Sequence, residues 1–308
     1  MQVVSFVGAV IISGCVLCAA PAAGGSANAQ TAPAATTSPA ASPPATTTLP
    51  RGRVYLFRGA LGLIFSRGMD KLAKRIEEAG VTVDVNEFTV CAYVAERAIR
   101  EYRQNPAPIT LIGHSMGGFC ALQFAEKLQA ENIPIGLIVT IDPAHLMPKL
   151  PMNVERYVNI FLARDVLGGG DVVPEKGYQG HFASFDLSKL KGVLHINIEK
   201  MDIIHTQLLT KILQIPETPA RLEGEGLPIR YVVPPDAAVD LWDSSMPAVV
   251  QAGDTLETLA IKYRVPLWAL TQINEIPEGA ALVANQRVIV PRHLVPLAAI
   301  TEQSPSKR

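Results

Sequence analysis

One serine in this chain lies in a setting that favours a nucleophile. Ser115 is the centre of Gly113-His114-Ser115-Met116-Gly117, a Gly-x-Ser-x-Gly spacing. An apolar run precedes it and a helical pattern follows, so the serine is expected on a tight turn between a strand and a helix. Glycine on either side removes side chains that such a turn would press against its neighbours. The helix would direct its amino end at the site, where it favours developing negative charge.

A serine nucleophile needs a histidine as general base, and two downstream histidines qualify. His195 follows the last expected strand of this region and precedes the last expected helix. His205 lies at the start of that helix and is also interpretable as a surface residue. We expect His195 to be the base, with His205 as the alternative. His114 adjoins the nucleophile, but we expect its side chain to point away.

Three aspartates are candidates for the acid that orients the base. Asp142 directly ends an expected strand and precedes Pro143. Asp165 lies just past the next expected strand, and Asp171 follows three consecutive glycines. Asp-Pro pairs also start turns without any catalytic role. We prefer Asp142, because a strand end fixes its position, and keep Asp165 and Asp171 as alternatives.

Two backbone N–H groups would have to stabilise the oxyanion formed during acyl transfer. Met116, directly after the nucleophile, is the first expected donor. Ala60, in the loop after the first strand, is the second, and Gly59 and Gly62 would let that loop approach Ser115. The sequence contains no Cys/His cluster with metal-ligand spacing, so neither a metal site nor a cofactor is predicted.

The elements that position these residues follow from hydrophobic patterning. Short apolar runs alternate with amphipathic stretches from residue 51 to about 216, which is the pattern of βα units and a parallel sheet. Strands are expected over 54–57, 81–85, 109–112, 135–141, 157–162 and 182–187, with helices over 69–79, 93–103, 116–130 and 204–215. Cys91 and Cys120 are interpreted as two small buried thiols.

In this order, the motifs resemble those of a minimal α/β hydrolase, similar to small lidless bacterial lipases and esterases. The resemblance is carried by the loop 57–62, the elbow 113–118, the two acids after later strands, and the Gly-x-x-His-x segment 192–196. Asp142 within Asp-Pro-Ala also resembles the acid of animal pancreatic-type lipases. The resemblance implies an α/β fold and ester hydrolysis through an acyl-serine. Arg58 departs from the usual histidine of the oxyanion loop, which makes substrate preference less certain.

A second set of motifs lies in residues 248–292. Gly253-Asp254-Thr255-Leu256 precedes two short helical patterns, and Val288 to Pro291 reads as a closing strand. Asp254 is the expected N-cap of the first helix. This segment resembles a LysM domain, which implies a βααβ fold and binding of N-acetylglucosamine polymers such as peptidoglycan or chitin. The resemblance implies contacts from two loops, made of Gly253, Asp254, Thr255, Asn274, Glu275 and Ile276.

The first residues differ in texture from the rest of the chain. Within residues 1–29, the stretch 3–20 is apolar and uncharged, and Ala27-Asn28-Ala29 follows it. This pattern predicts a cleaved signal peptide. A retained membrane span is one alternative. A lipoprotein signal, with Cys15 as the acylated residue, is another. Residues 30–50 consist mainly of Ala, Thr, Pro and Ser, which indicates an extended tether.

The predicted organisation is therefore a signal peptide (1–29), a linker (30–50), an α/β-hydrolase domain (51–216), a second linker (217–247) with one candidate strand at 229–233, a LysM domain (248–292) and a tail (293–308). With 27 basic and 28 acidic side chains, the chain lacks the basic excess of nucleic-acid-binding proteins. We expect an exported serine hydrolase of the periplasm or cell envelope, acting on a small ester or lipid. The alternative is a non-catalytic, peptidoglycan-binding envelope protein with an inactive hydrolase fold.

Overall fold

A computed structural model describes residues 52–60, 62, 66–217 and 227–293. The predicted signal peptide, the lipoprotein signal at Cys15, the tether and all but the first residue of the tail lie outside the described residues. None of the described helices has the length and apolar character needed to span a bilayer.

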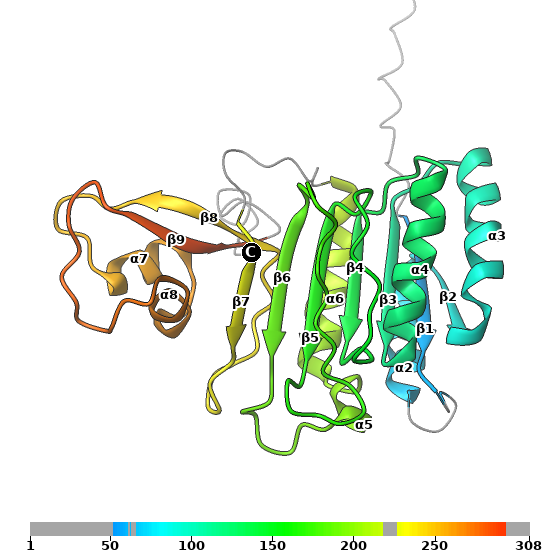
Figure 1. Ribbon diagram of the computed structural model, residues 1–308, viewed down its shortest axis with the longest axis horizontal. Coiled ribbons are helices and arrows are strands. Elements are labelled where there is room, and N and C mark those ends of the chain that lie inside the picture. Colours follow the sequence, from blue (N-terminus) through cyan, green and yellow to red (C-terminus); the bar gives the residue numbers. More distant parts are fainter. Residues whose placement is uncertain (1–51, 61, 63–65, 218–226, 294–308) are drawn as a thin grey trace, which may run out of the picture. The chain divides into compact units, whose positions relative to one another are not determined.

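A seven-stranded sheet forms the centre of the hydrolase region (Figure 1). Its order is β2-β1-β3-β4-β5-β6-β7, and every neighbouring pair is parallel. The strands are β1 (Arg53–Arg58), β2 (Thr82–Glu87), β3 (Ile109–His114), β4 (Leu137–Ile141), β5 (Arg156–Phe161), β6 (His181–Asp186) and β7 (Ile229–Val232). The predicted α/β class with a parallel sheet is confirmed.

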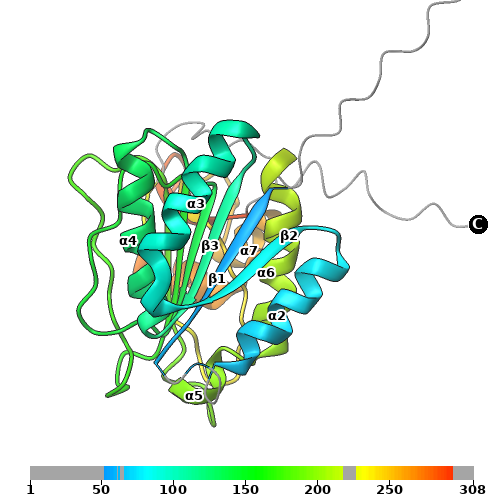
Figure 2. The same ribbon diagram turned by 90° about the vertical axis from the view of Figure 1, so that its right-hand side faces the viewer.

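Helices cover both faces of this sheet, as Figure 2 shows. One face carries α2 (Arg67–Glu78) and α6 (Asp202–Gln214), and the other carries α3 (Cys91–Gln104) and α4 (Met116–Ala130). Successive strand residues point to opposite faces. Leu56 and Ile112 therefore pack with α2 and α6, whereas Tyr55 and Leu111 pack with α3 and α4. The described residues of this region also include the short helical segments η1 (Phe88–Val90), α5 (His195–Ile198) and η2 (Ile215–Glu217).

The parallel arrangement gathers the candidate residues at one edge of the sheet. Ser115 follows the carboxyl end of β3 directly, and Asp142 follows that of β4. The segment after β6 leads into α5, which begins at His195. Because strands in a parallel sheet all end at the same edge, residues far apart in sequence become neighbours there.

Part of the segment expected to be a linker, residues 217–247, is ordered structure. β7 extends the sheet by pairing with β6, and β8 (Ser244–Val249) begins within the expected linker. Trp242, between them, is 0% exposed.

The LysM region has the expected βααβ order: β8, α7 (Leu256–Tyr263), α8 (Leu267–Asn274) and β9 (Arg287–Arg292), with β8 antiparallel to β9. The expected N-cap was wrong. The Thr255 hydroxyl oxygen caps α7 by accepting a hydrogen bond from the Thr258 N–H. The Thr258 hydroxyl oxygen accepts one from the Thr255 N–H. Asp254 instead accepts from the Gln251 N–H at 2.8 Å, which closes the turn before the helix.

Side chains of α8 contact the last strand of the parallel sheet. The Gln272 side chain accepts from the Val232 N–H at 2.8 Å and donates to the Val232 carbonyl at 3.3 Å. Trp268 packs edge-on against Tyr231, with ring centroids 5.3 Å apart. Gln272 thus satisfies one residue of an edge strand that would otherwise expose unpaired backbone groups.

Candidate active site

Ser115 lies on a sharp turn between β3 and α4. Its backbone has φ 56° and ψ −124°, a conformation that side-chain-bearing residues rarely adopt and that is typical of functional sites. The Ser115 N–H donates to the Ile141 carbonyl at 3.1 Å, which ties the turn to the end of β4. The residue is largely buried, with 9% of its surface exposed.

The glycines around Ser115 are required by close backbone approach. A Cβ on Gly113 would lie 2.1 Å from the Gly117 carbonyl oxygen, and a Cβ on Gly117 would lie 2.1 Å from that of Phe57. A Cβ on Gly59 would lie 2.7 Å from the Ser115 Cβ. The loop after β1 therefore rests directly against the candidate nucleophile, in the place expected for an oxyanion loop.

His195 and Asp142 form a buried pair. His195 Nδ1 lies 2.6 Å from Asp142 Oδ2, and the Asp142 side chain is fully buried. Asp142 Oδ1 accepts two backbone N–H groups, from Leu162 at 3.0 Å and Gly169 at 2.8 Å. Like Ser115, Asp142 has a positive φ, of 42°. The carboxylate is thus held from both sides, with one oxygen left for the imidazole.

Three consecutive glycines, Gly168 to Gly170, close over this carboxylate. A Cβ on Gly168 would lie 2.4 Å from the Asp142 Cγ, and a Cβ on Gly170 would lie 1.9 Å from the Ala144 carbonyl oxygen. Glycine at these positions therefore leaves the room that the loop needs to pack on Asp142.

The alternative acids occupy different places. Asp165 lies near the pair. A carboxylate oxygen of Asp142, one of Asp165 and a ring nitrogen of His195 all lie within 4.8 Å of one another. Asp165 Oδ1 accepts from the N–H groups of Leu167 and Gly168, and thereby shapes its own turn. Asp171 is paired with a different residue. Both of its carboxylate oxygens accept from Arg230 Nη1, at 2.5 and 2.6 Å.

His205, the alternative base, is buried rather than at the surface. Its exposed fraction is 0%, and its Nε2 lies 2.7 Å from the Glu199 carbonyl oxygen. The interpretation as a surface residue was wrong, because His205 lies on the buried face of α6 with Ile204 and Leu208. Within the described residues, His195 is the histidine that bonds a candidate acid.

The two expected oxyanion donors belong to segments that adjoin Ser115. Met116 begins α4, whose first N–H groups have no partners within the helix. Ala60 follows Gly59 in the loop that touches Ser115. Among the described residues, Ser115 Oγ and His195 Nε2 make no hydrogen bond to each other, a looseness common in substrate-free sites.

Two residues next to this site were given no role from the sequence. His114 is 1% exposed and its ring packs on that of His195, with centroids 4.8 Å apart. Burial, with a smaller contribution from His195, lowers the pKa of His114 to about 3. Ser66, the residue directly before α2, forms a hydrogen bond with His114 at 2.8 Å. The histidine within the elbow was the one available signal, since Ser66 has no distinguishing sequence context.

The expected glycan loops lie at the two ends of the LysM helices. Gly253, with φ 88°, makes the turn before α7, and Glu275, with φ 54°, makes the turn after α8. Asn274 is committed internally: its side chain donates to the Leu270 and Ile289 carbonyls and accepts from the Ile289 N–H. Its role in the fold is thus to fasten β9 to α8, whereas Thr255 and Glu275 are exposed.

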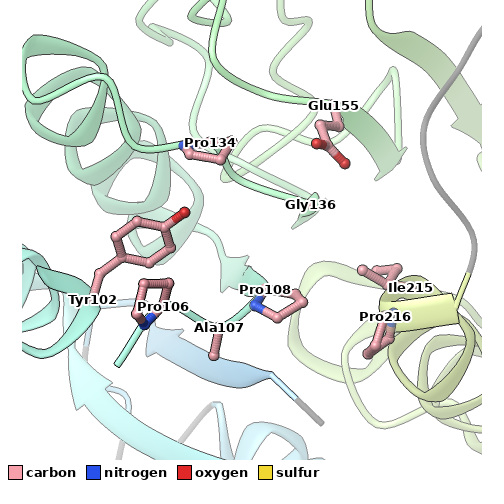
Figure 3. Close-up of a pocket in the computed structure, with 9 residues that line it drawn as sticks. All are labelled: Tyr102, Pro106, Ala107, Pro108, Pro134, Gly136, Glu155, Ile215 and Pro216. Atoms are coloured by element: carbon pink, nitrogen blue, oxygen red, sulfur yellow. The ribbon is translucent and has the colours of Figure 1, made fainter. Parts of the chain in front are cut away.

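A cavity of about 280 Å³ lies away from these residues (Figure 3). It is found where β3 and β4 begin, at the opposite edge of the sheet from Ser115. The residues that line it are mostly apolar: Tyr102, Pro106, Ala107, Pro108, Pro134, Gly136, Glu155, Ile215 and Pro216. Nothing about its lining connects it with acyl transfer.

Two family models match the chain. The LysM domain model matches residues 248–291, and the Thioesterase domain model matches residues 86–156, a span that includes Ser115 and Asp142. Together with the parallel sheet and the elbow, these matches show that the chain joins a hydrolase region of the α/β-hydrolase type to a C-terminal LysM domain.

A curated relative is GPI inositol-deacylase from Candida albicans (strain SC5314), which is 36% identical over 99 residues, or 30% of this chain. The chain spans 25% of that relative's length. Among solved structures, a covalent complex of the NocB thioesterase domain with a fluorophosphonate nocardicin G analog is 15% identical, with a TM-score of 0.32, covering 55% of this chain and 96% of that one. TT1662 from Thermus thermophilus is 14% identical, with a TM-score of 0.28, covering 60% and 80%.

Proposed function

We propose that this chain, which joins an α/β-hydrolase region to a LysM domain, is an exported serine hydrolase that cleaves an ester and is held at cell-wall glycan. The observation that carries the proposal is the buried bond of 2.6 Å between His195 and Asp142, beside a serine in a strained elbow. This is the set of groups that acyl transfer to serine needs: a nucleophile, a base and an acid that orients the base.

The proposed reaction uses each residue in one role. Ser115 Oγ attacks the ester carbonyl carbon while His195 Nε2 accepts the hydroxyl proton, and Asp142 stabilises the resulting imidazolium. The N–H groups of Met116 and Ala60 donate to the oxyanion. His195 then gives the proton to the leaving alcohol. Water activated by the same histidine hydrolyses the acyl-serine and restores the enzyme.

Apolar side chains around this edge of the sheet support an ester with an apolar acyl chain. The loops after β4 and β5 lie together, since His145 Nε2 is 3.3 Å from the Val166 carbonyl oxygen. Exposed large apolar residues on these loops and beside His195 are Leu146, Val166, Leu167, Leu194 and Ile196. Apolar side chains gathered beside a candidate site favour substrate contact. The Thioesterase match and the name of the deacylase relative agree with acyl chemistry.

The LysM domain supports the second half of the proposal. Domains of this family bind N-acetylglucosamine-containing glycans and are typical of extracellular or cell-envelope proteins, which agrees with the signal peptide predicted at residues 1–29. The exposed residues of the two loops, Gly253, Thr255 and Glu275, are the proposed glycan contacts. Peptidoglycan in the periplasm or envelope is the proposed partner.

A fluorophosphonate probe tests the hydrolase proposal. We expect it to label the wild-type protein and to leave Ser115→Ala unlabelled, with hydrolysis of p-nitrophenyl esters lost in the same variant. Esters of increasing chain length then define the acyl preference. A folded wild-type protein that neither reacts with the probe nor hydrolyses any ester would favour the inactive, glycan-binding alternative.

Sedimentation with purified peptidoglycan tests the glycan half separately. The protein should pellet with the polymer and be released by N-acetylglucosamine oligomers. Protein that stays in the supernatant while still reacting with the probe would remove the glycan-binding role and leave the hydrolase proposal standing.

A further inference from the structure

His114, the residue before the candidate nucleophile, has no role in the reaction proposed above, yet both of its ring nitrogens are engaged. Its Nδ1 lies 2.8 Å from Ser66 Oγ, and its Nε2 lies 3.0 Å from the backbone carbonyl oxygen of His195. Ser66 Oγ in turn accepts a hydrogen bond from the Gly59 N–H at 3.2 Å. The four residues form one buried chain from the oxyanion loop to the proposed base.

The direction of each hydrogen bond in this chain follows from the chemistry of its ends. The His195 carbonyl oxygen only accepts, so His114 Nε2 must carry the proton. Burial keeps the ring neutral, because it lowers the pKa of His114 to about 3. Nδ1 is then the unprotonated nitrogen, and the Ser66 hydroxyl donates to it. Ser66 Oγ keeps a lone pair for the Gly59 N–H, and all of these bonds are satisfied by one tautomer.

Ser66 gives independent support for this arrangement. It precedes α2, where a serine side chain ordinarily caps the helix by accepting a backbone N–H. Ser66 makes no such capping bond, although its side chain is almost completely buried. Its hydroxyl is used between Gly59 and His114 instead.

We propose that His114 is a positioning residue that, as the Nε2–H tautomer, ties the oxyanion loop to the backbone of the proposed base His195. The expected effect on turnover rests on the proposed function, whereas the expected tautomer of His114 does not. His195 begins a helix of four residues, α5, and its loop includes Gly192, whose surroundings are open. Asp142 holds the His195 ring, and His114 holds its backbone. Misplacement of a catalytic group by about 1 Å costs on the order of a hundredfold in rate.

Three substitutions separate the two bonds of His114. His114→Gln places an amide N–H near the position of Nε2 and keeps the donor to the His195 carbonyl. His114→Asn reaches only the position of Nδ1 and keeps the partner of Ser66. His114→Phe keeps the ring against His195 and removes both bonds.

We expect kcat for a p-nitrophenyl ester to fall less than about tenfold in His114→Gln, and about a hundredfold or more in His114→Asn and His114→Phe. KM should change little in all three, because His114 contacts the base rather than the substrate. Rates of fluorophosphonate inactivation should follow kcat. Equal losses in the Gln and Asn variants, or losses that only track thermal stability, would overturn the positioning role.

A measurement without turnover tests the tautomer itself. In protein labelled with ¹⁵N-histidine, the His114 signals, assigned by their loss in His114→Gln, should show a protonated Nε2 and an unprotonated Nδ1 throughout about pH 5 to pH 8. A protonated Nδ1, or titration of His114 within this range, would overturn the inference. If the tautomer is as expected but the wild type lacks probe reactivity, the proposed function fails and the buried connection stands.

Discussion

At the scale of single residues, the candidate acid is distinguished by how completely it is held. Asp142 is 0% exposed and accepts two backbone N–H groups in addition to the bond with His195. Asp165 lies close by but serves its own turn, and Asp171 forms an ion pair with Arg230 in a solvent-exposed setting. The three aspartates that patterning ranked only by position therefore differ clearly in their contacts.

Asparagine substitutions should rank these aspartates. Asp142→Asn is expected to lower kcat about ten-thousand-fold, because the amide favours the wrong histidine tautomer and gives no charge to stabilise the imidazolium. Asp171→Asn should change kcat less than about twofold, since an exposed ion pair contributes little. Asp165→Asn should fall between them. Turnover of the three variants, with folding checked by circular dichroism, decides the ranking. Retained activity in Asp142→Asn together with loss in Asp165→Asn would move the acid to the loop after β5.

Glu199, which follows α5, is expected to make the stability of the protein depend on pH. Its side chain is buried against Gly68 in the first turn of α2, and burial raises its pKa from 4.5 to about 7. Above pH 4.5 the unfolded chain releases this proton while the folded protein retains it until about pH 7. The unfolded state therefore binds fewer protons in this window, so stability falls as pH rises through it.

Glu199→Gln should remove this dependence. The free energy of unfolding of the variant, minus that of the wild type, should increase between about pH 4 and pH 8 by up to about 3 kcal/mol, corresponding to the rise in pKa. Urea unfolding at several pH values measures the difference. A difference that stays constant over this range would show that Glu199 ionises in the folded protein as it does in the unfolded chain.

At the scale of elements, the site depends on loops that approach each other more closely than a Cβ permits. The loop after β1 touches Ser115 at Gly59, and the loop after β5 touches Asp142 at Gly168. The strands determine where these loops begin, and the glycines allow the loops to approach Ser115 and Asp142 closely. The glycines of these loops are therefore part of the site.

Gly168→Ala should disturb the acid from a distance in sequence. The added Cβ would lie 2.4 Å from the Asp142 Cγ, which forces the carboxylate or the loop to move. We expect kcat to fall on the order of a hundredfold and stability to fall by about 1–3 kcal/mol. The control is Gly136→Ala, whose Cβ would meet the Ile215 Cγ2 at 3.0 Å and is remote from the site. Similar turnover in the two variants would argue against this role of the loop.

At the scale of the whole molecule, the LysM region and the hydrolase region are not joined by a bare linker. The buried apolar cluster that contains Ile229 and Tyr231 continues through Trp242 to Leu259 and Leu270. Deleting residues 247–308 would remove β9 and both LysM helices, and would expose this surface. Truncation is therefore a poor test of independent function, whereas point substitutions in the contact keep both regions present.

Trp268→Ala tests this contact. Loss of the ring that packs against Tyr231 and Trp242 should lower the free energy of unfolding by about 2 kcal/mol and increase protease cleavage between the two regions. Ile261→Ala is the control, because Ile261 is a 79% exposed apolar residue on the other LysM helix and should change stability by less than about 0.5 kcal/mol. Equal effects of the two substitutions would indicate that the regions unfold independently.

The sequence by itself determined the class of fold and the order of its elements. Apolar periodicity and the glycine spacing around Ser115 are local properties, and they predicted the parallel sheet, the strand-to-helix turn and the βααβ module. The predicted site residues and export segment remain predictions, to be tested as described above.

Only the tertiary structure decided which distant residues meet. Asp142 and His195 are far apart in sequence, and their contact depends on how loops from different strands pack at one edge of the sheet. The same holds for the chain from Gly59 through Ser66 and His114, and for the place of residues 229–232 in the sheet. Periodicity reports which face a residue occupies but not its partner, because side-chain contacts between loops follow from packing in three dimensions.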